Sequence, residues 1–185
     1  MKEVMAYDDA VDLLDADHKA VKKKFIDYNA MCEDGVPAAA RKKLAEEICQ
    51  ALTVHTRLEE ELFYPAVRKA TGDDALMDTA LDEHSEAKKV IAQIQSMSAS
   101  SEDLDKTVKT LAKLIDEHVL EEREQMFLEA RYAHMDLRSL AATMYARKKK
   151  LTAAVVKAAK SGKAGKSSEP KVKATQTAKS GKELT

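Results

Sequence analysis

Four of the five histidines in the chain recur in one pattern with carboxylates. In each repeat, a lone His lies on one predicted helix, and a His and a Glu four residues apart lie on the next. The pattern comprises Asp17-His18, His55-x-x-x-Glu59, Glu83-His84 and His118-x-x-x-Glu122. Residues four apart point to the same side of a helix, so each His/Glu pair can reach one centre. Because neutral imidazole and carboxylate bind iron, manganese and zinc, the pattern predicts a metal site.

The number of candidate ligands indicates more than one metal ion. Four imidazoles and two carboxylates exceed the four ligands of a tetrahedral zinc site, whereas a bridging carboxylate lets the same set hold two ions. A lone buried His, or a Glu on an apolar face, is commonly an ordinary residue. Two unpaired buried carboxylates, however, would each cost several kcal/mol against a total stability of ~5–15 kcal/mol. We therefore predict a pair of metal ions.

Four segments with apolar residues at spacings of three and four are predicted to be helices: 8–31, 38–70, 74–97 and about 104–132. Leu62 is placed on the apolar face of the second helix and Gln125 on that of the fourth. We expect Asp8 or Asp9, Asp73 and the Ser100-Ser101 pair as N-caps, and Gly72 as a C-terminal stop. Short connections between four such helices predict an all-α fold, an antiparallel up-down-up-down four-helix bundle.

The expected depth of the six candidates shows whether they can meet. A helix rises about 1.5 Å per residue, which places His18 about 15 Å from the start of the first helix. Measured from the same end of the bundle, the other five candidates lie roughly 15–22 Å along their helices. All six are therefore predicted to lie within about two helical turns of one another.

The C-terminal part of the chain differs in composition. We expect three parts: a bundle over residues 1–134, an amphipathic helix over 135–160 and a disordered Lys-rich tail over 161–185. From Arg147 onward, twelve Lys and Arg accompany two Glu, a net charge of +10, whereas the preceding residues carry 19 basic and 30 acidic groups. Such asymmetry is typical of an acidic globule with a basic extension.

The sequence also restricts the cellular location. No apolar run approaches the ~18 residues of a membrane-spanning helix, and the N-terminus MKEVMAYDDA lacks the apolar core of a secretory signal. Cys32 and Cys49 are too few for a disulfide framework and lack the spacing of a zinc site. We expect a cytoplasmic protein without membrane attachment, in which the two thiols are buried or inert rather than redox-sensitive.

The segments around the four repeated histidines resemble the hemerythrin-like (HHE cation-binding) family. These segments are LLDADHKAVKKKF, HTRLEEELFYP, LDEHSEAKKVIAQI and HVLEEREQMF, and the similarity covers roughly residues 8–151. The stretch DLRSLAATMYARKKKL resembles the end of one bacterial subgroup. The resemblance is specific because spacing and flanking residues agree at all four helices.

The resemblance implies a non-haem di-iron centre inside the four-helix bundle, with manganese or zinc as substitutes. Each iron would be served by two histidines: His18 with His55, and His84 with His118. Glu59 and Glu122 would bridge the irons together with an oxo, hydroxo or water ligand.

One departure from the family concerns the third helix. Oxygen-carrying members have a second His four residues after the first, where this chain has Lys88. Lys88 either extends to solvent or supplies a positive charge near the site. Further candidates for contacts with the ligands, which are equally well ordinary helix-face residues, are Glu60, Glu61, Glu121 and Tyr64. The departure favours redox chemistry or metal release over reversible oxygen transport.

These features support more than one function. The first is a di-iron protein that senses, binds or handles O2, NO or peroxide. The second is iron storage or donation, including repair of iron–sulfur clusters. The third is an acidic bundle whose basic tail associates with nucleic acid nonspecifically, although the tail is equally well a solvated extension. No dedicated catalytic residue is evident, so any turnover is expected to be weakly peroxidase- or catalase-like. The oligomeric state is not predicted.

Overall fold

The computed structural model describes residues 7–164, and the side chains of residues 7–158. Every regular element in this range is helical, so the predicted all-α fold is confirmed. The elements are α1 (Ala10–Glu33), α2 (Ala38–Leu58), η1 (Glu59–Phe63), α3 (Tyr64–Thr71), α4 (Asp74–Ser96), α5 (Leu104–Glu121), η2 (Glu122–Met126), α6 (Phe127–Tyr132) and α7 (Leu137–Ala164).

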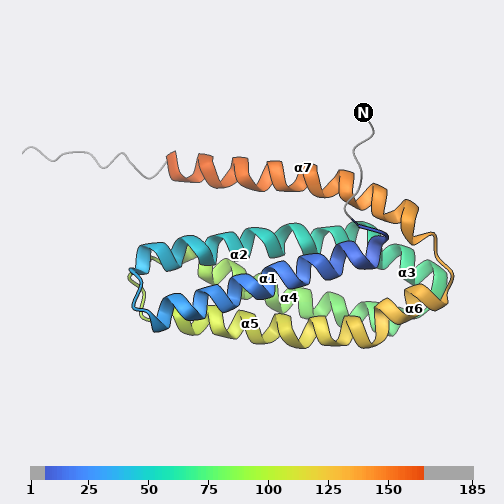
Figure 1. The fold of residues 1–185 in the computed structure, drawn as a ribbon, viewed down its shortest axis with the longest axis horizontal. Helices are drawn as coiled ribbons and strands as arrows, with labels where there is room; N and C mark the ends of the chain where they lie inside the picture. Colours follow the sequence, from blue (N-terminus) through green and yellow to red (C-terminus); the bar gives the residue numbers. More distant parts are fainter. Residues whose placement is uncertain (1–6, 165–185) are drawn as a thin grey trace, which may run out of the picture.

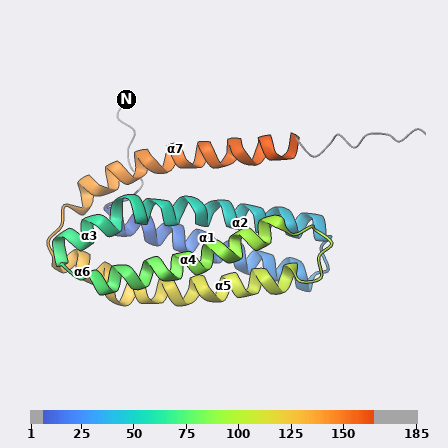
Figure 2. The ribbon, with the colours of Figure 1, turned by 180° about the vertical axis from the view of Figure 1, so that it is seen from behind.

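Four long helical rods lie side by side and alternate in direction, as Figures 1 and 2 show. The rods are α1, α2–η1–α3, α4 and α5–η2–α6, where η1 and η2 are single π-helical turns within continuous rods. This arrangement is the predicted helical bundle. The helix α7 lies along the outside, beside α2.

Side-chain caps fix where two of the helices begin. Asp9 and Asp73 each accept a hydrogen bond of 2.9 Å from the backbone N–H three residues later. Gly72 ends α3 with a φ of +75°, a left-handed conformation that glycine adopts without strain. The expected cap at Ser100 and Ser101 is wrong, because α5 begins after them and no side chain caps its first turn.

The predicted apolar faces are mostly buried up to the π-helical turns and shift by one residue beyond them. Two predicted positions before the turns are exceptions: Leu44 is half-buried, and Leu81 is 38% exposed. Past the start of η1, Phe63 is buried, whereas the predicted Leu62 is half-buried. Past the start of η2, Met126 is buried, whereas the predicted Gln125 is exposed. A π-helical turn holds more residues than an α-helical turn, so the side chains that follow are rotated around the axis. The prediction for these two positions is therefore wrong by one residue.

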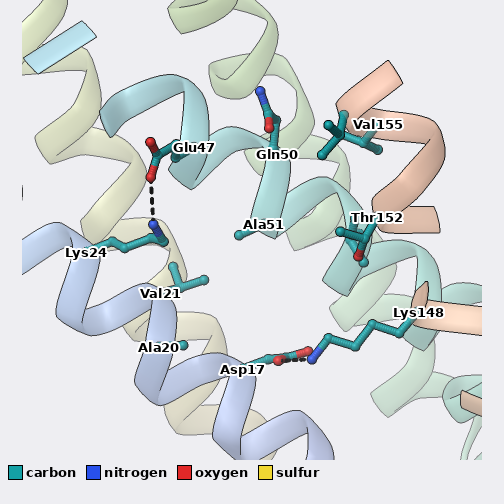
Figure 3. Close-up of a pocket in the computed structure, with 12 residues that line it drawn as sticks. Asp17, Ala20, Val21, Lys24, Glu47, Gln50, Ala51, Lys148, Thr152 and Val155 are labelled. Carbon is teal, nitrogen blue, oxygen red and sulfur yellow. Dashed lines mark hydrogen bonds and ion pairs between the residues drawn. The ribbon is translucent and has the colours of Figure 1, made fainter. Parts of the chain in front are cut away.

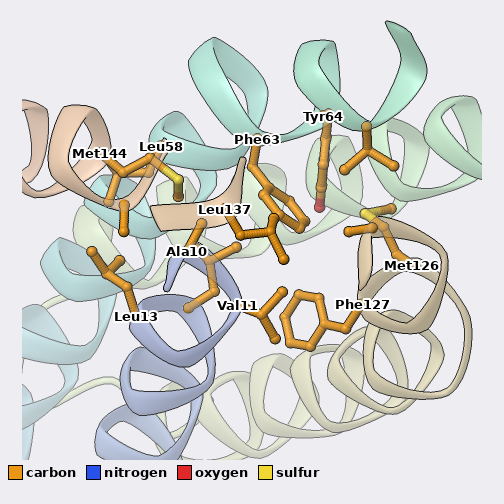
Figure 4. Packing of buried hydrophobic residues seen from close by; sticks show 14 of the residues in the cluster. Ala10, Val11, Leu13, Leu58, Phe63, Tyr64, Met126, Phe127, Leu137 and Met144 are labelled. Atoms are coloured by element: carbon orange, nitrogen blue, oxygen red, sulfur yellow. The ribbon is translucent and has the colours of Figure 1, made fainter. Parts of the chain in front are cut away.

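The core consists of two apolar clusters on opposite sides of the level occupied by the His/Glu repeats. One cluster gathers around α3, α6 and the first residues of α1 and α7. Figure 4 shows its centre, where the rings of Phe63 and Phe127 meet edge to face at 5.8 Å. The other cluster, with Phe25 and Tyr28, fills the end of the bundle where α1 turns into α2 and α4 into α5. The polar level between them is enclosed on both sides.

The helix α7 packs on α1 and α2 through one buried face, made by Leu137, Ala141, Met144 and Leu151. Arg147 pairs with Glu61 at 2.6 Å, and Lys148 pairs with Asp17 (Figure 3). A cavity of about 280 Å³ remains between these three helices. The helix extends to residue 164, four residues beyond the predicted end, and the rest of the predicted tail (residues 165–185) lies outside the described residues. No helix in the described range is long and apolar enough to cross a membrane.

Candidate metal centre

The six candidate ligands meet in the middle of the bundle. Two of the rods carry one candidate each and the other two carry a His/Glu pair. None of the six is more than 6% exposed: His18, His55, Glu59, His84, His118 and Glu122. They form two overlapping groups, His18/His55/Glu59/Glu122 and Glu59/His84/His118, in which the nearest donor atoms all lie within 4.8 Å of one another. Both carboxylates thus lie at the centre of the bundle and point inward.

The first group is built on α1, α2 and the two π-helical turns. The Nε2 atoms of His18 and His55 are 2.8 Å apart. Glu59 Oε1 lies 3.0 Å from His55 Nε2, and Glu122 Oε2 lies 3.3 Å from His18 Nε2. Two imidazole nitrogens and two carboxylate oxygens therefore converge on one point.

The second group repeats this geometry on α4 and α5. The Nε2 atoms of His84 and His118 are 3.1 Å apart. Glu59 presents its other oxygen here, with Oε2 3.3 Å from His84 Nε2. Glu122 Oε2 is 3.6 Å from His118 Nε2. Each glutamate thus contacts histidines of both groups, which is the arrangement expected of a bridging carboxylate.

The donor set fits a pair of cations. Glu59 is 0% exposed, and neither of its carboxylate oxygens has a hydrogen-bond partner among the described residues. A buried charge without a partner costs several kcal/mol. Cations between the two histidine pairs would neutralise this charge and give both oxygens a ligand role.

The electrostatics of the protein without metal lead to the same conclusion. Burial raises the pKa of a carboxyl group, yet the adjacent imidazoles of His55 and His84 hold the pKa of Glu59 well below its usual value. Burial alone would lower the pKa of His55, but Glu59 and Asp17 raise it to about 10. In the same way, Glu59 and Glu60 raise the pKa of His84 to about 9. Protonated imidazoles thus balance the buried carboxylate when no cation does so.

A second set of carboxylates lies beside the Nδ1 atoms of the imidazoles, which are the outer nitrogens, on the side of each ring away from the centre. Glu60 Oε1 lies 2.9 Å from His84 Nδ1, and Glu83 Oε2 lies 2.7 Å from His118 Nδ1. Asp17 Oδ2 lies farther, 3.7 Å, from His55 Nδ1. Glu60 was among the sequence candidates, whereas Asp17 and Glu83 were not. The signal was present, because each is the acid directly before a lone His of the repeat.

The remaining candidates lie in three different settings. Lys88 does not enter the site; its ammonium group binds both oxygens of Glu60 at 2.6 and 2.7 Å. Glu121 is exposed, and neighbouring Glu83 raises its pKa. Tyr64 is buried, donates its hydroxyl to Glu122 Oε1 at 2.9 Å and lies 3.1 Å from His84 Nε2. The fifth histidine, His134, is exposed in the turn before α7.

Both glutamates occupy the first position of a π-helical turn: Glu59 opens η1 and Glu122 opens η2. Single π-helical turns within α-helices frequently occur at functional sites. Here they rotate the following aromatic residues, Tyr64 and Phe127, toward the histidines. The centre is thereby closed on this side by rings from both rods.

Comparison with known proteins gives one partial match among curated sequences. A protein of Nostoc sp. (strain PCC 7120 / SAG 25.82 / UTEX 2576) named DNA nickase is 34% identical over 85 residues, and this chain spans about a quarter (24%) of its length. That match includes 46% of the present chain.

The crystal structure of a hemerythrin HHE cation binding domain-containing protein from Mycobacterium kansasii is similar in fold. It has a TM-score of 0.65 and 22% sequence identity, with 79% of this chain and 88% of that chain covered. The family model described as hemerythrin HHE cation binding domain matches residues 9–130, which include all four rods almost completely. The chain therefore belongs to the hemerythrin HHE cation binding domain family.

Proposed function

We propose that this protein binds two iron ions at the six central residues and that the centre senses, binds or handles O2, NO or peroxide. The observation that carries the proposal is the state of Glu59. Its two oxygens are fully buried without hydrogen bonds, and they face histidines of the two groups separately. Membership of a cation-binding family supports the presence of metal.

The residues of the chain have distinct roles in this proposal. The histidines offer Nε2 to the centre, and the two glutamates neutralise the charge of the cations and bridge them. Tyr64 orients Glu122 by donating to Oε1. The apolar clusters on both sides exclude bulk water. Iron held there would supply Fe²⁺/Fe³⁺ redox chemistry and open coordination positions for a small ligand.

Anaerobic loading with Fe²⁺ tests the proposal. We expect two iron ions per chain after gel filtration, and new near-ultraviolet and visible absorption on exposure to air, NO or H2O2. His84→Gln should lose iron, whereas His134→Gln should bind it like the wild type, because His134 is exposed outside the centre. Absence of bound iron, or spectra that none of the three ligands changes, would contradict the proposal.

Iron storage or donation is a second candidate. It is favoured by Lys88, which occupies the position of a further histidine in oxygen carriers and contacts Glu60 instead of the centre. With six protein ligands for two ions, iron is held less completely and can be released. Transfer of iron to an apo-ferredoxin, followed by its absorption spectrum, would support donation. Iron that does not exchange with a chelator would refute it.

A further inference from the structure

The two halves of the centre are built by corresponding parts of the internal repeat. We call His18 with His55 the His18 half, and His84 with His118 the His84 half. In each half an acid precedes the lone His and a Lys follows it by four residues. In each half, the rod that carries the second His also enters a π-helical turn at its glutamate. Differences at corresponding positions therefore show what distinguishes the two halves.

In the His84 half both outer nitrogens have a carboxylate partner. His84 Nδ1 lies 2.9 Å from Glu60, and His118 Nδ1 lies 2.7 Å from Glu83. Both are hydrogen-bond distances. An N–H donated from Nδ1 places the ring hydrogen there and leaves the Nε2 lone pair directed at the centre. The orientation of both rings is therefore fixed before a cation arrives, and Nδ1 keeps its hydrogen when a cation takes the place of a proton at Nε2.

In the His18 half neither outer nitrogen has such a partner. The Nδ1 atoms of His18 and His55 are buried and make no hydrogen bond within the described part of the chain. Asp17 corresponds to Glu83 but is one methylene shorter. Its Oδ2 stays 3.7 Å from His55 Nδ1, beyond hydrogen-bond distance, and its Oδ1 pairs with Lys148 of α7.

The partner for His18 is missing because the sequence changes at one position. Glu60 follows Glu59 in the first π-helical turn, and Arg123 follows Glu122 in the second. The guanidinium group of Arg123 pairs with Asp15 at 2.5 Å instead of contacting an imidazole. A cation therefore stands where the repeat would require a carboxylate.

These contacts govern how strongly an imidazole binds metal. A carboxylate on the outer nitrogen orients the ring and raises its basicity, and loss of such a partner typically lowers metal affinity by about 10–100-fold. The His84 half has two such partners at hydrogen-bond distance. The His18 half has none at that distance among the described residues.

We infer that the two cation positions have unequal affinity: the His84 half fills first and retains its ion, whereas the His18 half fills second and releases its ion first. This inference rests on the proposed function, because it presupposes that the six residues bind cations. It identifies Glu60 and Glu83 as positioning residues for the tight position. It also implies that a donated metal ion would come from the His18 half.

Titration of the metal-free full chain with Zn²⁺, followed by ¹⁵N NMR of the histidine rings, tests the order of filling. The first equivalent should shift the Nε2 signals of His84 and His118, and the second those of His18 and His55. The two dissociation constants should differ by at least about tenfold. Simultaneous or reversed filling would overturn the inference and leave the proposed metal site intact. Absence of any Zn²⁺ binding would overturn both.

A reciprocal pair of variants tests the cause. Asp17→Glu adds the missing methylene. We expect it to raise the Zn²⁺ affinity of the weaker position by about tenfold and so to reduce the difference between the two dissociation constants. Glu83→Asp should weaken the tighter position by a similar factor. Glu47→Gln is the control, because Glu47 is a carboxylate of α2 that pairs with Lys24 and contacts no ligand (Figure 3).

Circular dichroism of each metal-free variant shows whether it is folded. If Asp17→Glu does not fold, Glu83→Asp alone decides, since the shorter side chain fits the existing space. The inference would be overturned if the two Zn²⁺ dissociation constants of the folded variants stayed within about twofold of those of the wild type.

Discussion

Tyr64 and Phe127 occupy corresponding positions in the two repeats, each directly after a π-helical turn, and they contact the centre differently. The Tyr64 hydroxyl donates to Glu122 and lies beside His84. The Phe127 ring instead stacks on His18, with centroids 5.9 Å apart and an interplanar angle of 10°. One half of the centre receives a hydrogen-bond donor at this position and the other receives an apolar surface.

The same contrast recurs at the positions that contact the outer nitrogens. The four-residue spacing from His to Glu is identical in the two repeats, whereas Glu60 corresponds to Arg123 and Glu83 to Asp17. Spacing decides where the ligands converge, because it fixes the helix face and the level. The neighbouring residues decide how firmly each ring is held. Two halves with one geometry can therefore differ in chemistry.

The largest effect is expected from the residue that both halves share. Glu59→Gln removes the charge whose two oxygens face the two halves, so we expect cation binding to be lost in both, by more than about 100-fold. Zn²⁺ competition with a chromogenic chelator measures the loss. Glu122→Gln should be milder, because Tyr64 already holds one of its oxygens. Retention of both ions by Glu59→Gln would contradict the shared role of Glu59 in the two halves.

The pH dependence of stability should differ between metal-free and metal-bound protein. Both His55 and His84 have a pKa raised above 6.5, to about 10 and about 9. Their protonation stabilises the metal-free fold fully below pH 6.5, and this contribution is lost as pH rises through about 9 and 10.

Urea unfolding between about pH 6 and pH 10 measures this dependence. The metal-free protein should lose stability toward alkaline pH, with the His84 contribution lost at lower pH than that of His55. Zn²⁺-saturated protein should not show the loss, because bound metal requires neutral imidazole. A flat profile without metal would contradict the assignment.

A smaller effect is expected from making the two repeats alike after the π-helical turns. Tyr64→Phe leaves a buried oxygen of Glu122 without its donor, which should cost about 1–3 kcal/mol of stability. Chemical denaturation of the metal-free variant measures the cost. The control Tyr132→Phe, at a side chain that is 78% exposed, should change stability by less than about 0.5 kcal/mol. Equal effects of the two variants would exclude a role for the hydroxyl of Tyr64.

The smallest effect concerns α7, which packs on the rods of the first repeat. Arg147 lowers the pKa of Glu61 to about 2, so their ion pair stabilises the fold above the usual glutamate pKa of 4.5 and is lost as pH falls toward 2. Arg147→Gln should lower the melting temperature slightly at low salt and less at high salt. Lys113→Gln, which breaks an ion pair within α5, should have still less effect. A larger shift for Lys113→Gln would contradict this account.

The convergence of the six central residues could be predicted from the sequence. Apolar residues at spacings of three and four define one face of each helix, and the histidines and glutamates lie on those faces at one level. Residue spacing and helical rise contain all the information needed for this step. The structure brings His18, His55, Glu59 and Glu122 within 4.8 Å of one another, as expected.

The contacts around these residues could not be predicted in the same way. Asp17 lies near His55, and Glu83 contacts His118, so each acid serves a histidine of the next helix and not its own neighbour in sequence. Glu121, which the sequence suggested as a partner, lies between His118 and Glu122 on the same rod and is exposed. Partners that cross between helices depend on how two helices are rotated against each other.

The sequence by itself determined the helices, their buried faces as far as Glu59 and Glu122, and the level at which imidazoles and carboxylates converge. These follow from the α-helical repeat and the high cost of burying charge. Only the tertiary structure decided the two π-helical turns, the outer partners of the imidazoles and the position of α7. A π-helical turn has no strong local signature. It forms because packing of Tyr64 and Phe127 against the centre offsets its poorer backbone geometry, and such packing exists only once the rods have assembled.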